Sequence, residues 1–393
     1  MKLNKFIVNM IFMILILGAL VPVASYFFMG ILIVFIIICR QEKVIWNHLM
    51  QNKILLLLII STFLSSFFSE LWYISIPFSI LYIMKIIFSS IVSCYLDEGH
   101  VNKIIILLIG LGIIVSIVGI IQYFYSKGNM PESWVDSSLY NIDFRVYSTF
   151  FNPNILAVFL NLTILAGIVY NDINKDNNEY KIPAILCIVL STICLMLTYS
   201  RNGWLSLCVS VLAISIFNKS YRKYIFIFPV GFILFDFLVD AGRLLPSNLV
   251  SDSSIEYRIK IWIAAIRIVK DNFIFGVGAG TVWEQIPLYS SEIKAYISHV
   301  HNIYLQKLVD TGILGLLIFF WFISYIWNRI KKGIYCNKDI SFVILGFYIA
   351  ILSNGLLDAT SFQEQISIYL WTFIGISLAN IGFSKTADKS EAS

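Results

Sequence analysis

The fold class is decided by the stretch Lys103–Tyr125, KIIILLIGLGIIVSIVGIIQYFY, in which no charged residue follows the first lysine. A helix that crosses a lipid bilayer needs about 20 consecutive, mainly apolar residues. Similar runs recur along the chain of 393 residues, of which 59% are hydrophobic and 13% are charged, with a mean hydropathy of +0.84. Soluble domains carry about 25% charged residues. The sequence therefore predicts an all-α, polytopic membrane protein that forms a single integral membrane domain over residues 1–393.

About twelve apolar segments have the composition expected of membrane-spanning helices. Their approximate limits are residues 6–21, 23–39, 53–69, 72–95, 103–125, 153–170, 182–199, 203–218, 223–240, 302–328, 340–357 and 365–383. The first two are predicted to be separate helices divided near Pro22. Cleavage of a signal peptide there would still leave a second span, because apolar character resumes from Phe27 to Ile38.

Lysine and arginine residues are concentrated in every second loop between these segments. They occur at Lys2, Lys5, Arg40, Lys43, Lys53, Lys103, Lys175, Lys181, Lys219, Arg222, Lys223, Arg329, Lys331, Lys332, Lys338, Lys385 and Lys389. The opposite short loops, around Glu70 and from Asp358 to Glu364, contain neither residue type. Because cytoplasmic loops are enriched in lysine and arginine, both termini are expected in the cytoplasm.

Two longer segments, residues 126–152 and 241–301, lie on the outer side in this topology. The second segment is basic, with Arg243, Arg258, Lys260, Arg267, Lys270 and Lys294. The enrichment of lysine and arginine on the cytoplasmic side does not apply to long loops, so these basic residues do not contradict the topology. They indicate that an acidic ligand binds there. Apolar and basic residues alternate at helical spacing over Ile255–Lys270. This pattern predicts short amphipathic helices in the loop, either on the membrane surface or packed against the spans.

Cysteine placement and charge pattern argue against two other classes of protein. All six cysteines lie in apolar segments or in loops assigned to the cytoplasm, which argues against a disulfide framework. The net charge is +5, but the polar stretches lack the interleaved basic and aromatic residues of a nucleic-acid groove. We therefore expect no nucleic-acid partner. No P-loop or G-x-S-x-G motif is present, and no cofactor is predicted.

The stretch Ser200-Arg201-Asn202-Gly203 lies in a tight outer turn between two predicted spans. A helix is expected to begin at Asn202, so its free amide groups would point toward the same place as the guanidinium of Arg201. A guanidinium and a helix N-terminus together suit a phosphate or pyrophosphate. An interfacial arginine that extends toward lipid headgroups is the alternative interpretation.

The stretch His299-Val300-His301-Asn302 lies at the outer start of the predicted span 302–328. Histidine is a suitable general base near neutral pH, since its ordinary pKa is about 6.5. Of the four histidines in the chain, two occur within these three residues. Asn302 has the side chain of a helix cap. A pair of histidines can also bind a metal ion. However, no outer carboxylate or cysteine lies at a convincing ligand spacing from them, so no metal is predicted.

Weaker signals surround these two motifs. Asn152-Pro153-Asn154 has the composition of an ordinary helix start. The glycine-rich stretch 275–280 lacks the βαβ context of a dinucleotide site and is expected to be a flexible loop. Asp358 and Glu364 are candidates to orient a histidine or to bind sugar hydroxyls, although solvated loop charges explain them equally. Lys85 is unusual within an apolar span, and the sequence assigns it no role.

Together these motifs resemble the bacterial O-antigen ligase and O-antigen polymerase family of membrane glycosyltransferases. The resemblance covers roughly residues 150–330. It rests on the Asn152-Pro153-Asn154 start, Ser200-Arg201-Asn202-Gly203, Arg258 with Trp262, Gly276-x-Gly278-x-Gly280, His301-Asn302-x-x-Leu305, and Thr311-Gly312-x-x-Gly315. The first 150 residues match only in being apolar spans.

The resemblance implies a metal-independent transfer at the outer face of the bacterial cytoplasmic membrane. The donor would be a glycan on undecaprenyl pyrophosphate, and the acceptor a sugar hydroxyl of a surface polysaccharide. Arg201 and Arg258 would bind the pyrophosphate, His301 would activate the acceptor, and Asn302, His299 and Asn154 would support the site. Membrane lipid and other polysaccharide-assembly proteins are the further partners that it implies.

A ligase and a polymerase of this family differ only in the acceptor, and the sequence leaves that choice open. A flippase for lipid-linked oligosaccharides is the main rival function. It would need charged residues along the spans, whereas here the suggestive groups gather on one side. A non-catalytic scaffold that docks assembly proteins on the long loop is a third interpretation.

Overall fold

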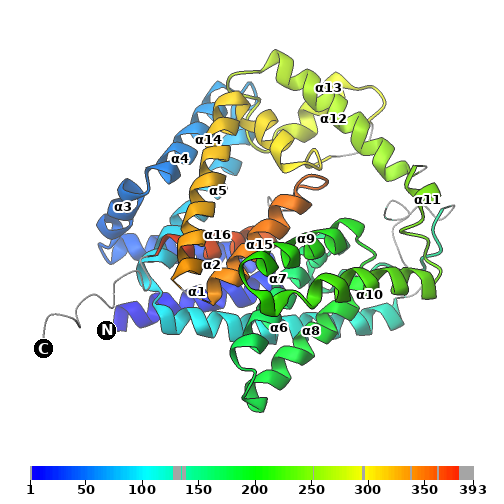
Figure 1. The fold of residues 1–393 in the computed structure, drawn as a ribbon. Coiled ribbons are helices and arrows are strands. Elements are labelled where there is room, and N and C mark those ends of the chain that lie inside the picture. Colours follow the sequence, from blue (N-terminus) through cyan, green and yellow to red (C-terminus); the bar gives the residue numbers. More distant parts are fainter. Residues whose placement is uncertain are drawn as a thin grey trace, which may run out of the picture.

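The computed structural model describes residues 2–126, 134, 139–250, 252–293, 297–336, 339–360 and 363–379. Helices account for 81% of the described residues, which form no strand, so the predicted all-α fold class is confirmed (Figure 1). The described residues exclude most of 126–138. They also exclude four of the lysines used above for the topology and the outer loop, namely Lys294, Lys338, Lys385 and Lys389.

The helices are numbered in chain order. The first six are α1 (Lys2–Leu20), α2 (Pro22–Ile38), α3 (Glu42–Gln51), α4 (Lys53–Phe68), α5 (Trp72–Tyr95) and α6 (Glu98–Tyr125). After the 3₁₀ turn η2 (Ser148–Phe150) come α7 (Pro153–Ile173), α8 (Asn178–Leu197), α9 (Arg201–Phe217), η3 (Lys219–Tyr221) and α10 (Tyr224–Leu238). The segment predicted as the long outer loop contains α11 (Pro246–Val250), α12 (Ser253–Asp271) and α13 (Val282–Tyr289). The last helices are α14 (Ile303–Tyr335), α15 (Ile340–Asn354) and α16 (Glu364–Leu378).

Six of these helices are long and apolar enough to cross a membrane, namely α1, α5, α6, α7, α8 and α14. The pair α2 and α3, bent by 105°, would make a seventh span. Every predicted span overlaps a helix, but α4, α9, α10, α15 and α16 have only 15–17 residues. Such helices are about 22 to 26 Å long, less than the bilayer core of about 30 Å. The predicted count of about twelve spans is therefore not confirmed.

Helix α7 forms the centre of the helical packing. Its sequence is apolar on all sides, which is typical of a helix surrounded by protein. Of the residues in its most apolar 18-residue stretch, 89% are buried. It packs against α6, α8, α9 and α15. Close contact with α6 depends on Gly112, because a Cβ atom there would lie 2.7 Å from Cβ of Thr163 on α7. This packing fixes the position of the N-terminal end of α7, where Asn154 lies.

Helix α14 is broken near its first third, at Gly312, whose φ is 63° and ψ is −170°. The backbone amide of Ile313 donates to the carbonyl of Phe273 at 2.8 Å, and that of Val277 donates to the carbonyl of Val309 at 2.9 Å. Gly276 has a positive φ of 70°, and a Cβ atom there would lie 2.4 Å from the carbonyl oxygen of Val309. The glycine-rich stretch predicted as a flexible loop is thus hydrogen-bonded to the break in α14.

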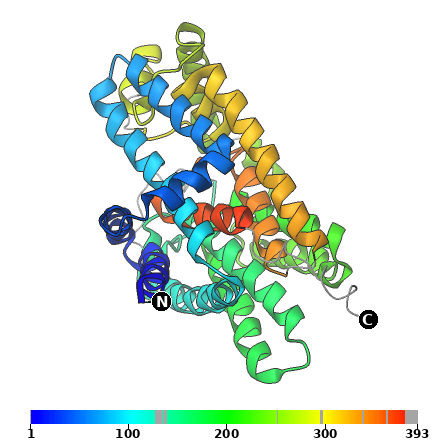
Figure 2. The same ribbon diagram turned by 90° about the vertical axis from the view of Figure 1, so that its left-hand side faces the viewer.

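The break divides α14 between two surroundings. In both views α14 runs beside α4, with α12 and α13 next to its N-terminal part (Figures 1 and 2). Apolar side chains of α12, including Ile261, Ala265 and Ile268, pack with Val282, Ile286 and Val309 in a cluster of their own. Helix α12 therefore has a fixed place against the start of α14, which sets the position of the residues it carries toward the site below.

Candidate functional site

Three helix starts and one loop bring the predicted site residues together. Side chains of Asn152, Ser200 and Asn302 accept hydrogen bonds from backbone amides and cap α7, α9 and α14. Each of these caps belongs to a motif singled out in the sequence. The fourth component is the loop after α15, which carries Asp358. The site is thus built around helix ends, whose first amide groups these side chains satisfy.

The loop after α15 is attached to the start of α14 by backbone groups. The amide of Ile303 donates to the carbonyl of Gly355 at 2.8 Å. The Asn302 side-chain amide donates to the carbonyl of Leu356 at 3.0 Å, while its oxygen caps Tyr304 and Leu305. His301, just before the cap, has a φ of 53°. This left-handed conformation is unusual for a residue other than glycine.

Both histidines of the motif contact Asp358. Nδ1 of His301 lies 3.2 Å from Oδ1 of Asp358, and Nε2 of His299 lies 3.3 Å from the same oxygen. The amide of Ala359 also donates to this oxygen at 2.8 Å. Burial raises the pKa of the Asp358 carboxyl, but the hydrogen bonds from His299 and His301 outweigh it and hold the pKa well below its ordinary value. Asp358 is therefore an ionised carboxylate at neutral pH.

The contacts with Asp358 assign the two imidazoles different proton positions. An ionised carboxylate only accepts hydrogen bonds, so Nδ1 of His301 and Nε2 of His299 carry protons. Nε2 of His301 then keeps its lone pair, and no described residue is hydrogen-bonded to it. Nδ1 of His299 instead faces the hydroxyl of Ser298 at 2.8 Å and the amide of Gln363 at 3.4 Å. His301 is thus the histidine with a free basic nitrogen.

The pKa of His301 is lowered from its ordinary value of 6.5. Burial is the largest cause, and the nearby His299 and Arg258 act in the same direction. The hydrogen bond with Asp358 and its negative charge oppose this effect without cancelling it. His301 is consequently neutral at physiological pH, as a general base must be before it accepts a proton.

Asn154 connects the histidine pair to a group of arginines. Its side-chain amide donates to Oδ2 of Asp358 at 3.2 Å. Its side-chain oxygen accepts from Nη2 of Arg145 and from the hydroxyl of Ser200, each at 3.0 Å. The second asparagine of the Asn152-Pro153-Asn154 motif therefore lies between the loop after α15 and the start of α9.

Arg145 was not among the residues predicted from the sequence. It is only 6% exposed, and its guanidinium also donates to the carbonyls of Thr198 at 2.8 Å and Trp134 at 3.0 Å. Burial and the charges of Arg243 and Arg201 lower the pKa of Arg145 well below its ordinary value. The signal in the sequence was slight, a single arginine eight residues before α7 in an otherwise uncharacterised loop.

Arg201 already has a carboxylate partner. Its guanidinium pairs with Asp252 and donates to the hydroxyl of Tyr140 at 3.0 Å. Burial raises the pKa of the Asp252 carboxyl, but the hydrogen bonds from Ser254, Tyr140 and Arg201 together outweigh this effect. The pKa is therefore held below its ordinary value, and the carboxyl is ionised. Because Asp252 caps α12, this pair joins the start of α9 to the start of α12.

Arg243 also lies against the ring of Tyr140. Its guanidinium carbon is 4.4 Å from the centre of the Tyr140 ring. Burial and the nearby Arg201 lower the pKa of Arg243 to about 10. Several positive charges therefore share a small region, with Asp252 as a carboxylate partner.

Arg258 is the predicted arginine with no hydrogen bond or ion pair to a described residue. It is half-buried on α12, and its charge acts on both Arg145 and His301. Trp262, one turn further along α12, donates from Nε1 to the carbonyl of Val300 at 2.9 Å. This bond holds α12 against the His299–His301 segment. Arg258 is therefore the guanidinium best placed to meet an anion next to His301.

The three residues predicted to converge are connected as follows. The charge of Arg258 acts on His301, and the charges of Arg258 and Arg201 both act on Arg145. Of the predicted supporting residues, Asn154 and His299 both contact Asp358, and Asn302 fixes the loop that carries it. The arrangement offers a neutral base oriented by a carboxylate, beside a cluster of guanidinium groups. That combination suits attack by a hydroxyl group at a centre with an anionic leaving group.

His299, His301 and Asp358 also form a possible metal-ligand set. One ligand atom from each lies within 4.8 Å of the others. The two histidine–carboxylate separations, 3.2 and 3.3 Å, match the distance of about 3.3 Å between two ligands of one tetrahedral zinc ion. The sequence did not reveal this set, because Asp358 is 57 residues from His301. The same geometry thus fits a hydrogen-bonded base or two imidazole ligands and a carboxylate.

Comparison with known proteins bears on the middle of the chain. No curated protein sequence matches it. Asn154, Arg145 and Asp358 lie outside the range that a family model covers, whereas Arg201 and His301 lie inside it. Together with the apolar helices, the match indicates a multi-pass membrane protein of the glycosyltransferase type. Residues 186–320 match the family model described as O-antigen ligase, and this match confirms the family resemblance found in the sequence.

Proposed function

We propose that the protein transfers a glycan from undecaprenyl pyrophosphate to a sugar hydroxyl of a surface polysaccharide, at the outer face of the bacterial cytoplasmic membrane. The observation that supports this most strongly is His301, whose ring Asp358 orients and whose Nε2 has no hydrogen-bond partner among the described residues; the charge of Arg258, which has no such partner there either, acts on this ring. Both termini are cytoplasmic in this proposal, which rests on the distribution of lysine and arginine.

The chemistry needs a base and a site for negative charge. As the acceptor oxygen attacks the anomeric carbon, its proton passes to Nε2 of His301. The bond between the anomeric carbon and the pyrophosphate oxygen breaks, and the lipid pyrophosphate leaves with one more negative charge. Asp358 stabilises the imidazolium that forms, as the carboxylate of a catalytic triad does. The positive charges of Arg258 and the neighbouring Arg145 offset the charge that develops on the leaving group.

No metal ion or cofactor is needed for these steps, because arginines supply the positive charge. The metal-ligand set at His299, His301 and Asp358 makes this a point to test directly. We expect EDTA treatment of the purified protein to leave the transfer rate unchanged. Activity that is lost with EDTA and restored by zinc would contradict metal independence.

The function itself is tested by complementation of a strain that lacks the gene, scoring surface polysaccharide and lipid-linked donor. We expect His301→Gln and Arg258→Gln to reach the membrane normally, abolish polymer and cause donor to accumulate on the outer side. His100→Gln and Arg267→Gln are matched controls, since His100 belongs to the capping box at the start of α6 and Arg267, among the described residues, is hydrogen-bonded to the Tyr289 carbonyl on α13. Normal polymer in both site variants would overturn the proposal, and donor trapped on the cytoplasmic side would favour a flippase.

The acceptor distinguishes a ligase from a polymerase. The family match is to O-antigen ligase, so we expect a purified lipid A-core acceptor to be glycosylated in a reconstituted assay. Elongation of a lipid-linked repeat instead would assign the polymerase reaction to the same site.

A further inference from the structure

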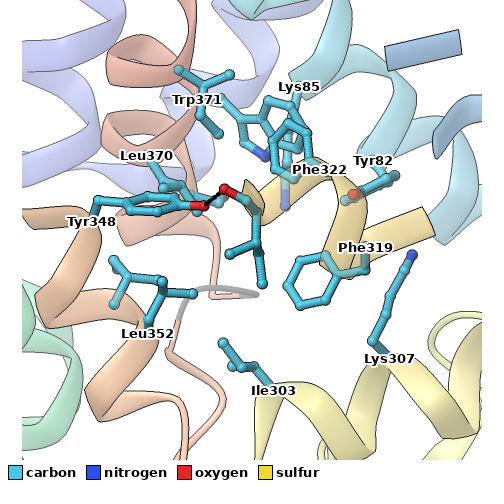
Figure 3. A pocket seen from close by; sticks show the side chains of 14 residues that line it. Tyr82, Lys85, Ile303, Lys307, Phe319, Phe322, Tyr348, Leu352, Leu370 and Trp371 are labelled. Carbon is cyan, nitrogen blue, oxygen red and sulfur yellow. Dashed lines mark hydrogen bonds between the residues drawn. The ribbon is translucent and has the colours of Figure 1, made fainter. Parts of the chain in front are cut away.

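The loop after α15, which carries Asp358, is attached to the rest of the protein mainly by hydrogen bonds. Its two leucines, Leu356 and Leu357, are 54% and 39% exposed. Next to the loop, Ile303 and Leu352 line a cavity of about 50 Å³ between α5, α14, α15 and α16 (Figure 3). Side chains that border a cavity lack partner atoms on that side and lose the corresponding dispersion contacts. The position of the Asp358 carboxylate therefore depends on its hydrogen bonds more than on apolar packing.

Asp358 is bound at both of its carboxylate oxygens. Oδ1 accepts hydrogen bonds from the two histidines and from the amide of Ala359, whereas Oδ2 accepts from the side-chain amide of Asn154 at 3.2 Å. A carboxylate held at one oxygen can still rotate about its bond to Cβ, so the contact at the second oxygen fixes the plane of the group. Asn154 therefore contributes to the direction in which Asp358 holds the ring of His301.

The hydrogen bonds of Asn154 determine which end of its side chain faces Asp358. Its Oδ1 atom accepts from Nη2 of Arg145 and from the hydroxyl of Ser200, each at 3.0 Å. A guanidinium group only donates, and an ionised carboxylate only accepts. A reversed amide would place its NH₂ group against Arg145 and its oxygen against Asp358, so both contacts would be repulsive. Arg145 therefore holds Asn154 with its NH₂ group toward Asp358.

Arg145 is itself fixed in the fold. Its neighbours Phe144 and Val146 are buried, and the amide of Val146 donates to the carbonyl of Leu197, at the end of α8, at 3.0 Å. Nε and Nη1 of Arg145 donate to main-chain carbonyls, while Nη2 donates to Asn154. The planar guanidinium keeps these donors in one rigid arrangement. Arg145 therefore holds the Asn154 oxygen in a defined place.

The surroundings of Arg145 favour an action within the protein over direct contact with a ligand. It is only 6% exposed, whereas Arg258 is half-buried and has no hydrogen bond or ion pair to a described residue. None of the described hydrogen-bond partners of Arg145 is a carboxylate, and the charge of Asp358 acts on it from beyond Asn154. Burying a charge without a direct counterion is unfavourable. A contribution to stability alone therefore explains its burial poorly.

We propose that Arg145 is a positioning residue for the transfer reaction. By holding the oxygen of Asn154, it directs the amide onto Asp358 and keeps this carboxylate, with the ring of His301, in the orientation that transfer requires. This inference rests on the proposed function. It adds to that function a role for a residue that lies outside the range of the family match.

A double-mutant cycle separates this positioning effect from a direct effect of the Arg145 charge on the leaving group. We would measure kcat and the KM for the donor in the reconstituted natural chain, in Arg145→Met, in Asn154→Ala and in the double variant. Each single variant should lower kcat at least tenfold and change the KM for the donor less than twofold. In the Asn154→Ala background, Arg145→Met should lower kcat no more than threefold, because the contact that it removes is already absent.

Two matched controls test for general effects of these substitutions. Asn174 is a half-buried asparagine at the opposite end of α7, where it donates to the carbonyl of Tyr170 at 3.0 Å. Arg267 is hydrogen-bonded to the carbonyl of Tyr289, among the described residues. Asn174→Ala and Arg267→Met should both keep the kcat of the natural chain. The Tm of every variant shows whether the fold is retained.

Equal losses of kcat from Arg145→Met in the two backgrounds would overturn the proposal, and so would a rise in the KM for the donor at unchanged kcat. If Arg145→Met cannot be purified, Asn154→Ala alone decides, because an unchanged kcat would show that the contact with Asp358 has no part in the reaction. A natural chain that transfers no glycan would instead contradict the proposed function and remove this inference with it.

Discussion

His299 and His301 differ in what their second ring nitrogen contacts, although both bind Asp358. The second nitrogen of His299 is occupied by Ser298 and Gln363, and that of His301 is free of described partners. One carboxylate oxygen thus orients two rings for different purposes. Only His301 retains a nitrogen that can accept the proton of an acceptor hydroxyl. His299 is a positioning residue that helps to keep Asp358 ionised.

Asp358→Asn is expected to lower kcat by about 100-fold or more, the usual contribution of an oriented general base. The amide cannot stabilise the imidazolium, and its NH₂ group would favour the other tautomer of His301. The rate of glycan transfer by the reconstituted protein measures this change, with the KM for the donor little altered. Asp176→Asn, at an exposed loop position, is the matched control. An unchanged kcat in Asp358→Asn would remove Asp358 from the mechanism.

The pH dependence of kcat/KM should reflect the lowered pKa of His301. The neutral ring is the active form, so activity is retained above the pKa and is lost as the pH falls through it. Because that pKa lies below 6.5, the acid midpoint should also lie below 6.5. Arg258 contributes to the lowering, so the residual transfer by Arg258→Gln in the reconstituted assay should show an upward-shifted midpoint, while Arg267→Gln should not. A midpoint above 6.5 in the natural protein would contradict this assignment.

The role of Asp358 could not be predicted from the sequence because its partners are distant along the chain. His301, Arg258 and Asn154 lie in or near short local motifs, so they could be selected from composition and helix-start chemistry. Asp358 was noted only as one of two loop carboxylates. Its contacts with His301 and Asn154 span 57 and 204 residues. Only the packing of α7, α14 and α15 determines which loop charge reaches the histidines.

At the scale of single elements, the broken helix α14 carries the start of the site. Its first segment holds Asn302 and Lys307, and the break at Gly312 lets the remainder run alongside α4. The glycine-rich stretch before α13 is held to this break by main-chain hydrogen bonds. The sequence predicts a flexible loop there, because glycine content alone does not distinguish a flexible segment from one packed closely against another backbone.

Gly312→Ala is expected to destabilise the protein more than its small size change implies. A Cβ atom would lie 2.2 Å from the carbonyl oxygen of Ile274, and φ is +63°. The backbone conformation alone costs on the order of 1–3 kcal/mol for other residues. Thermal unfolding in detergent should show a clearly lower Tm. Gly110→Ala on α6 is the control, since no atom lies within 4 Å of its Cβ position, and an equal Tm for both variants would contradict the clash.

At the scale of the whole molecule, the number of spans is what the sequence could not determine. Helix α16 has 15 residues, and twelve of them are buried, so its apolar character serves contact with other helices. Hydropathy alone does not separate a short buried helix from a membrane span. The charge pattern, the all-α class and the order of the helices were all visible in the sequence. The match of helix length to bilayer thickness was not.

The same scale includes the attachment of the α11–α13 segment to the membrane helices. Arg201 at the start of α9 pairs with Asp252 at the start of α12, and their side chains are 17% and 2% exposed. Breaking a buried pair by removing one partner costs about 3–5 kcal/mol. Asp252 also accepts from the hydroxyl of Tyr140 at 2.6 Å, so three segments meet at this carboxylate.

Asp252→Asn should therefore loosen α12 without unfolding the membrane helices. We expect faster hydrogen exchange over Ser253–Asp271 and unchanged exchange in α7, because α7 is surrounded by other helices. The variant should also raise the KM for the donor, since Arg258 is carried by α12 and loses its fixed position beside His301. Asp271→Asn is the control, because Asp271 is at the other end of α12 and its hydrogen-bond partner among the described residues is the hydroxyl of Tyr289. If exchange over α12 stays slow in Asp252→Asn, the apolar contacts with α13 and α14 hold this helix without the ion pair. Arg201 would then have no role in positioning α12, and binding of substrate would be its remaining role.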